Sequence, residues 1–354
     1  MRYPQIQIDQ TKLRHNAERL LDLFRERQMH LEVATDLIAA DDNIVQTLID
    51  VGCERFSDAR LGNLERLSRF PVMRTLTRAP MLSDVNRVVD ACEISYNTNE
   101  EVLNRLAVAA TLKNKVHGVV LLVESGDLAQ GVSADRIVDL AGHVINQEGL
   151  ELLGVTADFT RIGGIIPDRY NLTALANLAR SIEKRYRINL PLINGGGSSA
   201  LDMVTGGNIP ARINCLTIGE ALWFGRETSH GHRISDLYLD VFTLVAQVIE
   251  CQIKDSLPTG ERQTYRVDAF PEWENEGKIR RAILALGELD TDCRHLEPKL
   301  RGMGFIGSSD GLLVYNVSYL NADLNVGDDV LFSLDRVSLG RCFASSHVSR
   351  VMVR

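Results

Sequence analysis

An aspartate follows the first short apolar run of the chain, at a place where a side chain could take part in chemistry. The segment Leu31-Glu-Val-Ala-Thr-Asp36-Leu37 predicts a strand with Asp36 at its carboxyl end, and a helix opens at Ala40-Asp41-Asp42. In a parallel barrel the carboxyl ends of the strands face the active site. The sequence therefore predicts that the Asp36 carboxylate lies in a candidate active site.

A second candidate site is the glycine-rich segment from Asn194 to Ser199. It follows a predicted strand and precedes the helix-like residues 200–205. Glycines let backbone N–H groups approach an anion closely, and hydroxyl groups add donors at the amino end of a helix. The loop after the next predicted strand could supply a second wall, so the pairing favours a phosphate site over a flexible turn. The predicted phosphate-binding residues are Gly195, Gly196, Gly197, Ser198, Ser199, Ile218 and Gly219.

The histidines and cysteines predict no metal site. His230 and His232 flank a glycine, but no carboxylate stands near them at ligand spacing, and a turn at a domain junction is the more frequent explanation. The six cysteines are scattered without a Cys-x-x-Cys motif. Reduced thiols of a cytoplasmic protein account for this distribution.

The composition is that of an ordinary soluble globular protein. Of 354 residues, 45% are apolar and 24% are charged, and the net charge is −8. The chain has no dense block of Lys and Arg, which argues against nucleic acid as a partner. No apolar stretch approaches the roughly 18 residues of a membrane span, and the amino terminus lacks a signal-peptide run. We therefore expect a cytoplasmic protein that binds neither nucleic acid nor membrane.

The first two thirds of the chain show the pattern of an α/β barrel. Between about residues 11 and 230, helical patterns alternate with eight strand-like runs, which matches a (β/α)₈ TIM barrel. The expected strands are 30–35, 54–57, 72–77, 93–96, 116–124, 151–157, 189–194 and 213–218. The expected helices are 11–28, 41–51, 60–69, 82–91, 99–112, 133–147 and 170–187.

The pattern changes after about residue 235. Period-2 alternation appears in runs near 238–251, 282–286, 312–317 and 328–334, separated by Gly, Pro and Asp clusters. We assign residues 10–232 to the barrel and residues 233–354 to a C-terminal mainly β domain. Residues 1–9 are assigned to this second domain too, because Gln5–Asp9 alternates in the same way.

Several motifs, taken together, resemble one enzyme family. They are Asp41-Asp-Asn-Ile-Val-Gln-Thr-Leu, Ser57-Asp-Ala-Arg-Leu-Gly-Asn-Leu-Glu-Arg-Leu67, Arg78-Ala-Pro-Met-Leu-Ser83, Gly163-Gly-Ile-Ile-Pro167, Gly195–Ser199, Ile218-Gly-Glu-Ala221, Gly225-Arg-Glu-Thr228 and Arg281-Ala-Ile-Leu-Ala285. The chain resembles the alanine-racemase fold, fold type III of the pyridoxal-phosphate (PLP) enzymes, and most of all the branch with ornithine and lysine racemases. The resemblance implies a PLP barrel, a β domain and a homodimer with active-site clefts shared between subunits. It places Asp268–Phe270 and Ser308–Asp310 against the partner's barrel.

Three positions depart from the family pattern. The family's Schiff-base lysine aligns with Asp36, an arginine near the cofactor's phenolic oxygen with Ala129, and an arginine at the pyridine nitrogen with Thr217. A carboxylate cannot form an imine. A like-charge contact at about 4 Å and an effective dielectric of about 20 costs about 4 kcal/mol. We therefore expect PLP to bind non-covalently and weakly at best, or not at all.

Three arginines are candidate ligand-binding residues. Arg78 ends the third predicted strand and Arg60 begins the helix after the second, and both match family positions that could hold a substrate carboxylate or a phosphate. Ordinary salt bridges are the alternative. Arg161 is a cation that the family segment lacks, and it could neutralise Asp36 or Asp158 across the barrel mouth. A solvated loop residue is the alternative for Arg161.

The first hypothesis is an amino-acid-racemase-like protein that has lost its Schiff-base chemistry. Such a protein would bind a small anionic ligand, for example an amino acid or a phosphorylated compound, or pair with an active relative. The alternative is an active PLP-dependent amino-acid racemase with a misaligned lysine, or an enzyme that runs another reaction. A yellow cofactor adduct that borohydride traps on a lysine would favour this alternative.

Overall fold

The computed structural model describes residues 2–262 and 273–354, and the chain divides into two compact units. Thr11–Leu239 form one unit, and Met1–Gln10 together with Asp240–Arg354 form the other. Asp268–Phe270, which the resemblance assigns to a shared cleft, lie outside the described residues.

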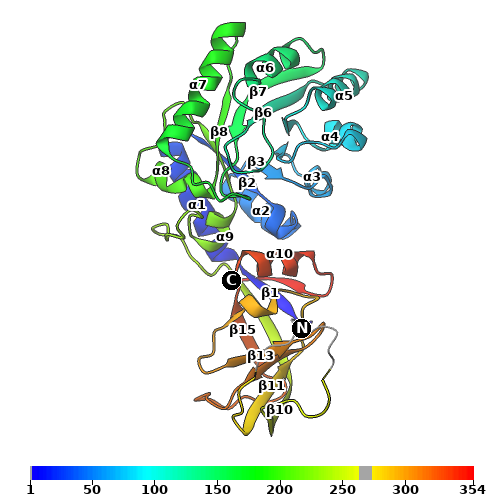
Figure 1. Ribbon diagram of the computed structural model, residues 1–354, viewed down its shortest axis with the longest axis vertical. Coiled ribbons are helices and arrows are strands. Elements are labelled where there is room, and N and C mark those ends of the chain that lie inside the picture. The colour runs from blue at the N-terminus through cyan, green and yellow to red at the C-terminus, as the bar shows by residue number, and fades with distance from the viewer. Residues whose placement is uncertain (1, 263–272) are drawn as a thin grey trace. The chain divides into compact units, whose positions relative to one another are not determined.

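The larger unit is a closed barrel of eight parallel strands (Figure 1). The strands are β2 (His30–Ala34), β3 (Arg55–Asp58), β4 (Met73–Leu76), β5 (Ile94–Asn97), β6 (His117–Val123), β7 (Leu150–Ala157), β8 (Leu192–Gly197) and β9 (Cys215–Ile218). Each strand pairs with the next, and β9 closes the ring against β2, where Leu31 is the partner of Leu216. β6 is buried along its whole length, as expected for a parallel strand covered on both faces. The predicted (β/α)₈ barrel is confirmed.

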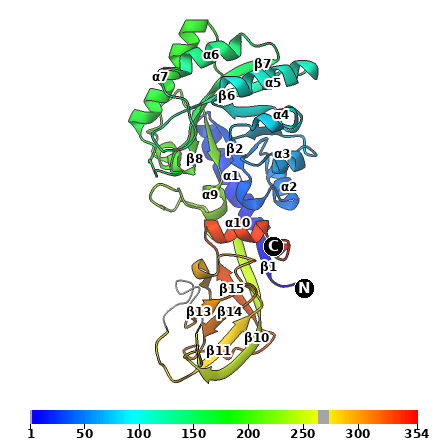
Figure 2. The same ribbon diagram turned by 45° about the vertical axis from the view of Figure 1, so that its right-hand side comes forward.

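Helices surround the barrel (Figures 1 and 2). They are α1 (Gln10–Glu26), α2 (Asp42–Val51), α3 (Leu61–Leu67), α4 (Val85–Ala91), α5 (Glu100–Leu112), α6 (Ile137–Ile145), α7 (Arg169–Tyr186), α8 (Leu201–Thr205) and α9 (Glu220–Phe224). α1 is amphipathic and buries Leu13, Leu20 and Phe24 at helical spacing. Asp168 begins α7 in a capping box with Asn171, which satisfies backbone donors at the helix start.

The barrel unit extends to Leu239, beyond the residue 232 that the sequence assigns as its end. The reason is a set of hydrogen bonds from α1. Asn16 is fully buried, and its amide donates to the carbonyls of Leu222 and Tyr238 at 3.0 and 2.9 Å, while its oxygen accepts the Tyr238 N–H at 2.7 Å. Leu237 is buried beside them. The segment after residue 232 therefore belongs to the barrel.

The smaller unit is built on one eight-stranded sheet. Its strands are β1 (Gln5–Asp9), β10 (Phe242–Asp255), β11 (Lys278–Leu284), β12 (Glu297–Pro298), β13 (Gly304–Ser308), β14 (Leu313–Asn316), β15 (Asp329–Ser333) and β16 (Ser349–Val353). β1 pairs antiparallel with β10 and parallel with β16, so the amino terminus joins this sheet as predicted. The mainly β domain is confirmed. The helix α10 (Arg336–Ala344) and the strands β12, β13 and β16 are elements that the sequence patterns did not predict.

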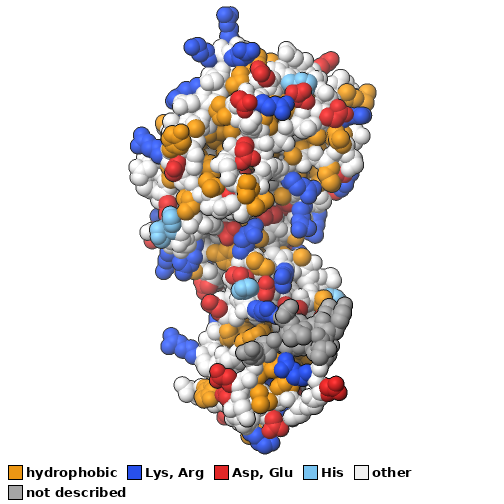
Figure 3. All heavy atoms as spheres, viewed as in Figure 1, with side chains coloured by type: hydrophobic (Ala, Val, Ile, Leu, Met, Phe, Trp, Pro, Cys, Tyr) orange, Lys and Arg blue, Asp and Glu red, His pale blue; other side chains and the backbone are white. Residues whose placement is uncertain are grey.

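Two surface properties bear on possible partners. On the face of the barrel unit that Figure 3 shows, Lys and Arg side chains are interspersed with Asp and Glu side chains. Among the described residues, no helix has both the length and the apolar character that a membrane crossing requires.

The close approach of β7 to β8 predicts a severe effect of one small substitution. A Cβ atom on Gly154 would lie 1.6 Å from the carbonyl oxygen of Leu192, which is backbone and cannot move aside. We expect Gly154→Ala to lower the free energy of unfolding by about 3 kcal/mol or more, measured by urea denaturation. Gly62→Ala is the matched control, because it lies in α3 with open space around it and should gain up to about 1 kcal/mol. Equal stability of the two variants would contradict this packing.

Candidate functional site

A cavity of about 280 Å³ lies at the carboxyl ends of the barrel strands. Its wall is formed by residues that end the strands or follow them, which is where barrels carry their functional groups. Six residues that the sequence singles out line it together: Asp36, Arg78, Ala129, Asp158, Arg161 and Thr217. The fold therefore gathers residues that are distant in the sequence into one site.

Asp36 is held at the cavity by a tight turn. It begins a 3₁₀ turn, Asp36–Ile38, directly after β2, and the apolar Leu37 and Ile38 are buried. The N–H of Ala40 bonds to the carbonyl oxygen of Thr35 at 3.2 Å and closes the turn. The Asp36 side chain is half-buried and makes no hydrogen bond or ion pair with any described residue. Its carboxylate is thus available to a ligand.

Asp58 is a second carboxyl group at this cavity; it stands in one of the family motifs of the sequence but was not assigned to the site. It ends β3, is 1% exposed, and accepts the Thr35 hydroxyl at 2.8 Å, the Asn63 amide at 2.9 Å and the Arg60 N–H at 2.7 Å. Burial raises the pKa of Asp58 to about 6, although these hydrogen bonds favour its ionised form, and the nearby Asp36 carboxylate adds to the increase.

The predicted pair between Arg161 and Asp36 does not form. Arg161 Nε lies 3.0 Å from Asp158 Oδ1 instead, so the alternative partner that the sequence offered is the one used. The reason is local: Arg161 follows Asp158 in the same loop, and its backbone N–H donates to the fully buried Asp127 at 2.6 Å. Asp158 is thus the direct partner of Arg161, while the more distant charges of Asp36 and Glu220 also help to raise the Arg161 pKa.

Arg78 and Arg60 differ in their relation to the cavity. Arg78 is exposed at its edge and makes no hydrogen bond or ion pair with any described residue. The Arg60 side chain is exposed and does not line the cavity, although its backbone N–H bonds to Asp58. Of the two, Arg78 is placed to meet an anionic group of a ligand.

The glycine-rich segment continues a strand and is not the loop that the sequence predicts. Gly195–Gly197 end β8, and Gly197 is the register partner of Thr217 on β9. Gly196 has φ +100°, a conformation that favours glycine. The segment contacts the turn after β9, as a site with two walls requires. Ser198 Oγ accepts the N–H groups of Gly219 and Ala221 at 3.3 and 3.2 Å. Two amides of the second wall are thus bonded to this hydroxyl.

The floor of the cavity is a buried hydrogen-bond network. Thr217 lines the cavity and donates to Glu32 Oε2 at 2.8 Å, while Thr75 donates to Glu32 Oε1 at 2.6 Å. Glu32 is 3% exposed, and burial raises its pKa. One signal in the sequence could have revealed it, namely a carboxylate in the middle of the apolar strand Leu31–Ala34.

A serine on the wall lacks a partner. Ser57 lies on β3, is 0% exposed, and its hydroxyl forms no hydrogen bond with any described residue. A buried hydroxyl without a partner costs about 1–3 kcal/mol. Because Ser57 lines the cavity, a ligand could satisfy this hydroxyl.

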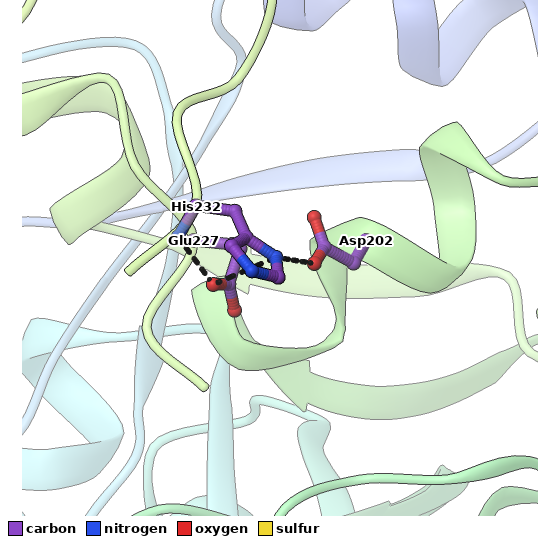
Figure 4. Close-up of side chains that lie close together, drawn as sticks. All are labelled: Asp202, Glu227 and His232. Carbon is purple, nitrogen blue, oxygen red and sulfur yellow. Dashed lines mark hydrogen bonds and ion pairs between the residues drawn. The ribbon is translucent and has the colours of Figure 1, made fainter. Parts of the chain in front are cut away.

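Carboxylates do lie beside His232, contrary to the expectation from sequence spacing. Figure 4 shows Asp202 and Glu227 around it, with His232 Nδ1 3.1 Å from Asp202 Oδ2 and 3.9 Å from Glu227 Oε1. The Glu227 side chain is fully buried and accepts backbone N–H groups from Ser229, His230 and His232 at 2.6, 2.9 and 2.7 Å. These three donors use most of its lone pairs, so the geometry indicates a carboxylate that organises this loop.

The pKa of Asp58 predicts how the protein responds to pH. Because the folded state binds this proton more tightly than an unfolded chain does, the stabilising contribution is full below about pH 4 and is lost as the pH rises through about 6. The loss is on the order of 3 kcal/mol. Carbon-13 NMR of the carboxyl groups should show Asp58 titrating near pH 6, and at lower pH in Asp36→Asn. A midpoint near pH 4 in both proteins would contradict the burial of Asp58.

Comparison with known proteins places the chain among racemases. No protein-family model matches it. It is 34% identical over 355 residues to the ornithine racemase of Acetoanaerobium sticklandii, covering 99% of this chain and 100% of that protein, and 28% identical over 356 residues to the lysine racemase of Thermotoga maritima, covering 99% of each. The alanine racemase structure from Streptomyces lavendulae shares the fold, with a TM-score of 0.79 and 15% identity over 100% of this chain and 98% of that one. The chain belongs to the family of amino-acid racemases that includes ornithine racemase.

Proposed function

We propose that this racemase-family protein forms no Schiff base and binds an amino acid non-covalently in the barrel cavity. The observation that carries the proposal is the lack of an amine in the cavity wall. Asp36 occupies the turn after the first barrel strand, and among the described residues, which include every lysine of the chain, no lysine lines the cavity. The lysines are Lys12, Lys113, Lys115, Lys184, Lys254, Lys278 and Lys299.

The residues present do not fit PLP held in the way that the family resemblance implies. When bound through a lysine amine, PLP serves as the electron sink of amino-acid chemistry. The Asp36 carboxylate cannot form that bond. At the glycine segment, the N–H groups of Gly219 and Ala221, which an anion would need, already bond to Ser198. A phosphate would have to displace this hydroxyl, so we infer weak PLP binding at best.

The groups that lack partners match the two charges of an amino acid. The Asp36 carboxylate can accept an ammonium group, and the Arg78 guanidinium can hold a carboxylate at the edge of the cavity. The Ser57 hydroxyl offers one more hydrogen bond. Two relatives are named for ornithine and lysine, which carry a second ammonium group, and the buried Asp58 carboxyl near Asp36 adds negative charge to this part of the cavity when it is ionised.

A phosphorylated anion is the other ligand class that the sequence favours. It would meet the Arg78 guanidinium, but also the carboxyl groups of Asp36 and Asp58 in the same cavity. Repulsion between the negative charges of the ligand and of these carboxylates opposes binding. The amino acid is therefore the better match.

Placing the lysine of the family pattern at position 36 should restore a Schiff base with PLP. After incubation with PLP and removal of the free cofactor by gel filtration, we expect the unmodified protein and Asp36→Asn to retain no yellow colour, and Asp36→Lys to retain the yellow absorbance of a Schiff base. Adding Ala129→Arg and Thr217→Arg to Asp36→Lys should tighten PLP binding on the order of tenfold, because two cations then face the cofactor. A yellow unmodified protein with racemase activity would support the alternative, an active PLP-dependent racemase, which the 34% identity to ornithine racemase favours.

Calorimetry with amino acids tests the binding site itself. The panel consists of the L and D forms of ornithine, lysine and alanine. We expect Arg78→Gln to weaken binding of every bound amino acid by about tenfold or more, because it removes a charged hydrogen-bond partner of the carboxylate. Arg60→Gln is the matched control, since the Arg60 side chain is exposed but does not line the cavity. Equal weakening by both variants, or no binding by the unmodified protein, would contradict the proposal.

A further inference from the structure

Glu32 is a buried carboxyl group at the centre of the barrel that forms no ion pair with any described residue. It accepts three hydroxyl groups: Thr75 at 2.6 Å, Thr217 at 2.8 Å and, more distantly, Tyr96 at 3.5 Å. Glu32 and Thr217 are register partners where β2 and β9 close the barrel. Thr217 alone among these hydroxyl residues also lines the cavity.

The direction of the Thr217 proton follows from its other neighbour. Asn194 Oδ1 accepts the backbone N–H of Gly196 at 2.9 Å, which fixes the orientation of this amide because a backbone N–H can only donate. The Asn194 NH₂ group must then donate, and it lies 2.9 Å from both Thr217 Oγ1 and the Tyr96 hydroxyl. Thr217 receives one hydrogen bond from Asn194, and its own proton goes to Glu32. One lone pair of Thr217 Oγ1 stays unused by these two contacts, and its neighbours are the cavity and the Tyr96 hydroxyl.

We infer that Glu32, acting through Thr217, makes the cavity floor a hydrogen-bond acceptor and so selects ligands that place an N–H donor there. An ammonium group has such donors, whereas a carboxylate or a bare heterocyclic nitrogen has none. With an amino acid as ligand, the ammonium group faces Thr217 and Asp36, and the carboxylate points outward to Arg78. This orientation rests on the proposed function, while the polarity of Thr217 does not.

The polarity of Thr217 depends on Glu32 Oε2 being an acceptor. Burial raises the pKa of Glu32, against the hydrogen bonds from Thr75, Thr217 and Tyr96 and the charge of Arg55 on β3. If Glu32 is ionised, both of its oxygens accept. A proton on Oε1 would face Thr75 and leave Oε2 accepting from Thr217 and Tyr96, whereas a proton on Oε2 would be donated to Thr217 and would turn the Thr217 proton away from Glu32. The inference therefore requires that Oε2 carries no proton.

Neutron diffraction of the ligand-free protein, exchanged into heavy water, tests the polarity directly. We expect the deuterium on Thr217 Oγ1 to lie on the line to Glu32 Oε2, and the two deuterium atoms of the Asn194 amide to point at Thr217 and Tyr96. A Thr217 deuterium that points into the cavity would overturn the inference. Because this measurement uses the unmodified protein without a ligand, it does not depend on the proposed function or on how a variant folds.

Glycine and its N-methylated forms test the selection. Glycine, sarcosine, dimethylglycine and glycine betaine have the same charges but successively fewer N–H donors. We expect glycine to bind about tenfold more tightly than betaine, as measured by saturation-transfer NMR. Thr217→Val should reduce this preference, and Thr75→Val, which removes a Glu32 partner outside the cavity, should keep it. Unfolding midpoints of both variants are measured alongside.

The outcomes separate the two proposals. A preference for glycine that is as large in Thr217→Val as in the unmodified protein would overturn the selection by Thr217, since size alone would then explain it. If neither these four compounds nor the ornithine, lysine and alanine panel binds, the amino-acid function fails, and the deuterium position still decides the polarity of the floor.

Discussion

The pairing of β9 with β2 closes the barrel, and the composition of the candidate site depends on this closure. In the register between β2 and β9, Glu32 lies opposite Thr217, and Val33 lies opposite Ile218. Side chains alternate along a strand, so this register turns Glu32 and Thr217 into the barrel together. It also brings the turn that carries Asp36 to the cavity that Thr217 lines. A shift by one residue would exchange these inward side chains for outward ones.

Oxygen acceptors dominate the chemistry of the cavity. Asp36 and Asp58 line its wall, Glu32 lies beneath Thr217, and Arg161 is bonded to Asp158. Such a lining opposes a phosphate-bearing cofactor and suits ammonium groups, because charge complementarity sets which ligands are excluded as well as which are accepted. Arg78 adds a positive charge at the edge of the cavity. This arrangement is the basis for proposing a ligand with separated charges.

The periodicity of the sequence was sufficient to predict the architecture. Eight alternating helical and strand-like patterns predicted the barrel, and Gln5–Asp9 was correctly joined to the β domain, because burial of one or both strand faces leaves a repeat in the sequence. The glycine segment was predicted as a loop but ends β8, since glycine carries no side chain whose periodicity could reveal a strand. The helix α10 was missed where its hydrophobic pattern is weak.

The sequence brought several cavity-lining residues together but did not predict their contacts. Strand ends identified Asp36, Asp158 and Thr217, because parallel strands deliver their ends to one place. Which partner a side chain chooses depends on loop geometry that spacing does not encode. Arg161 therefore bonds to its neighbour Asp158 and not to Asp36, and the loop at Glu227 meets Asp202 from another element.

The most direct test of the central claim is the mass of the protein after reduction with borohydride in the presence of an equimolar amount of PLP. A Schiff base on a lysine becomes a stable covalent bond under these conditions, and peptide mapping locates it. The absence of an amine from the cavity predicts no stoichiometric modification, with at most sparse labelling spread over lysines on the surface. Complete modification of a single lysine would contradict the claim and would identify the protein as a cofactor-bearing member of its family.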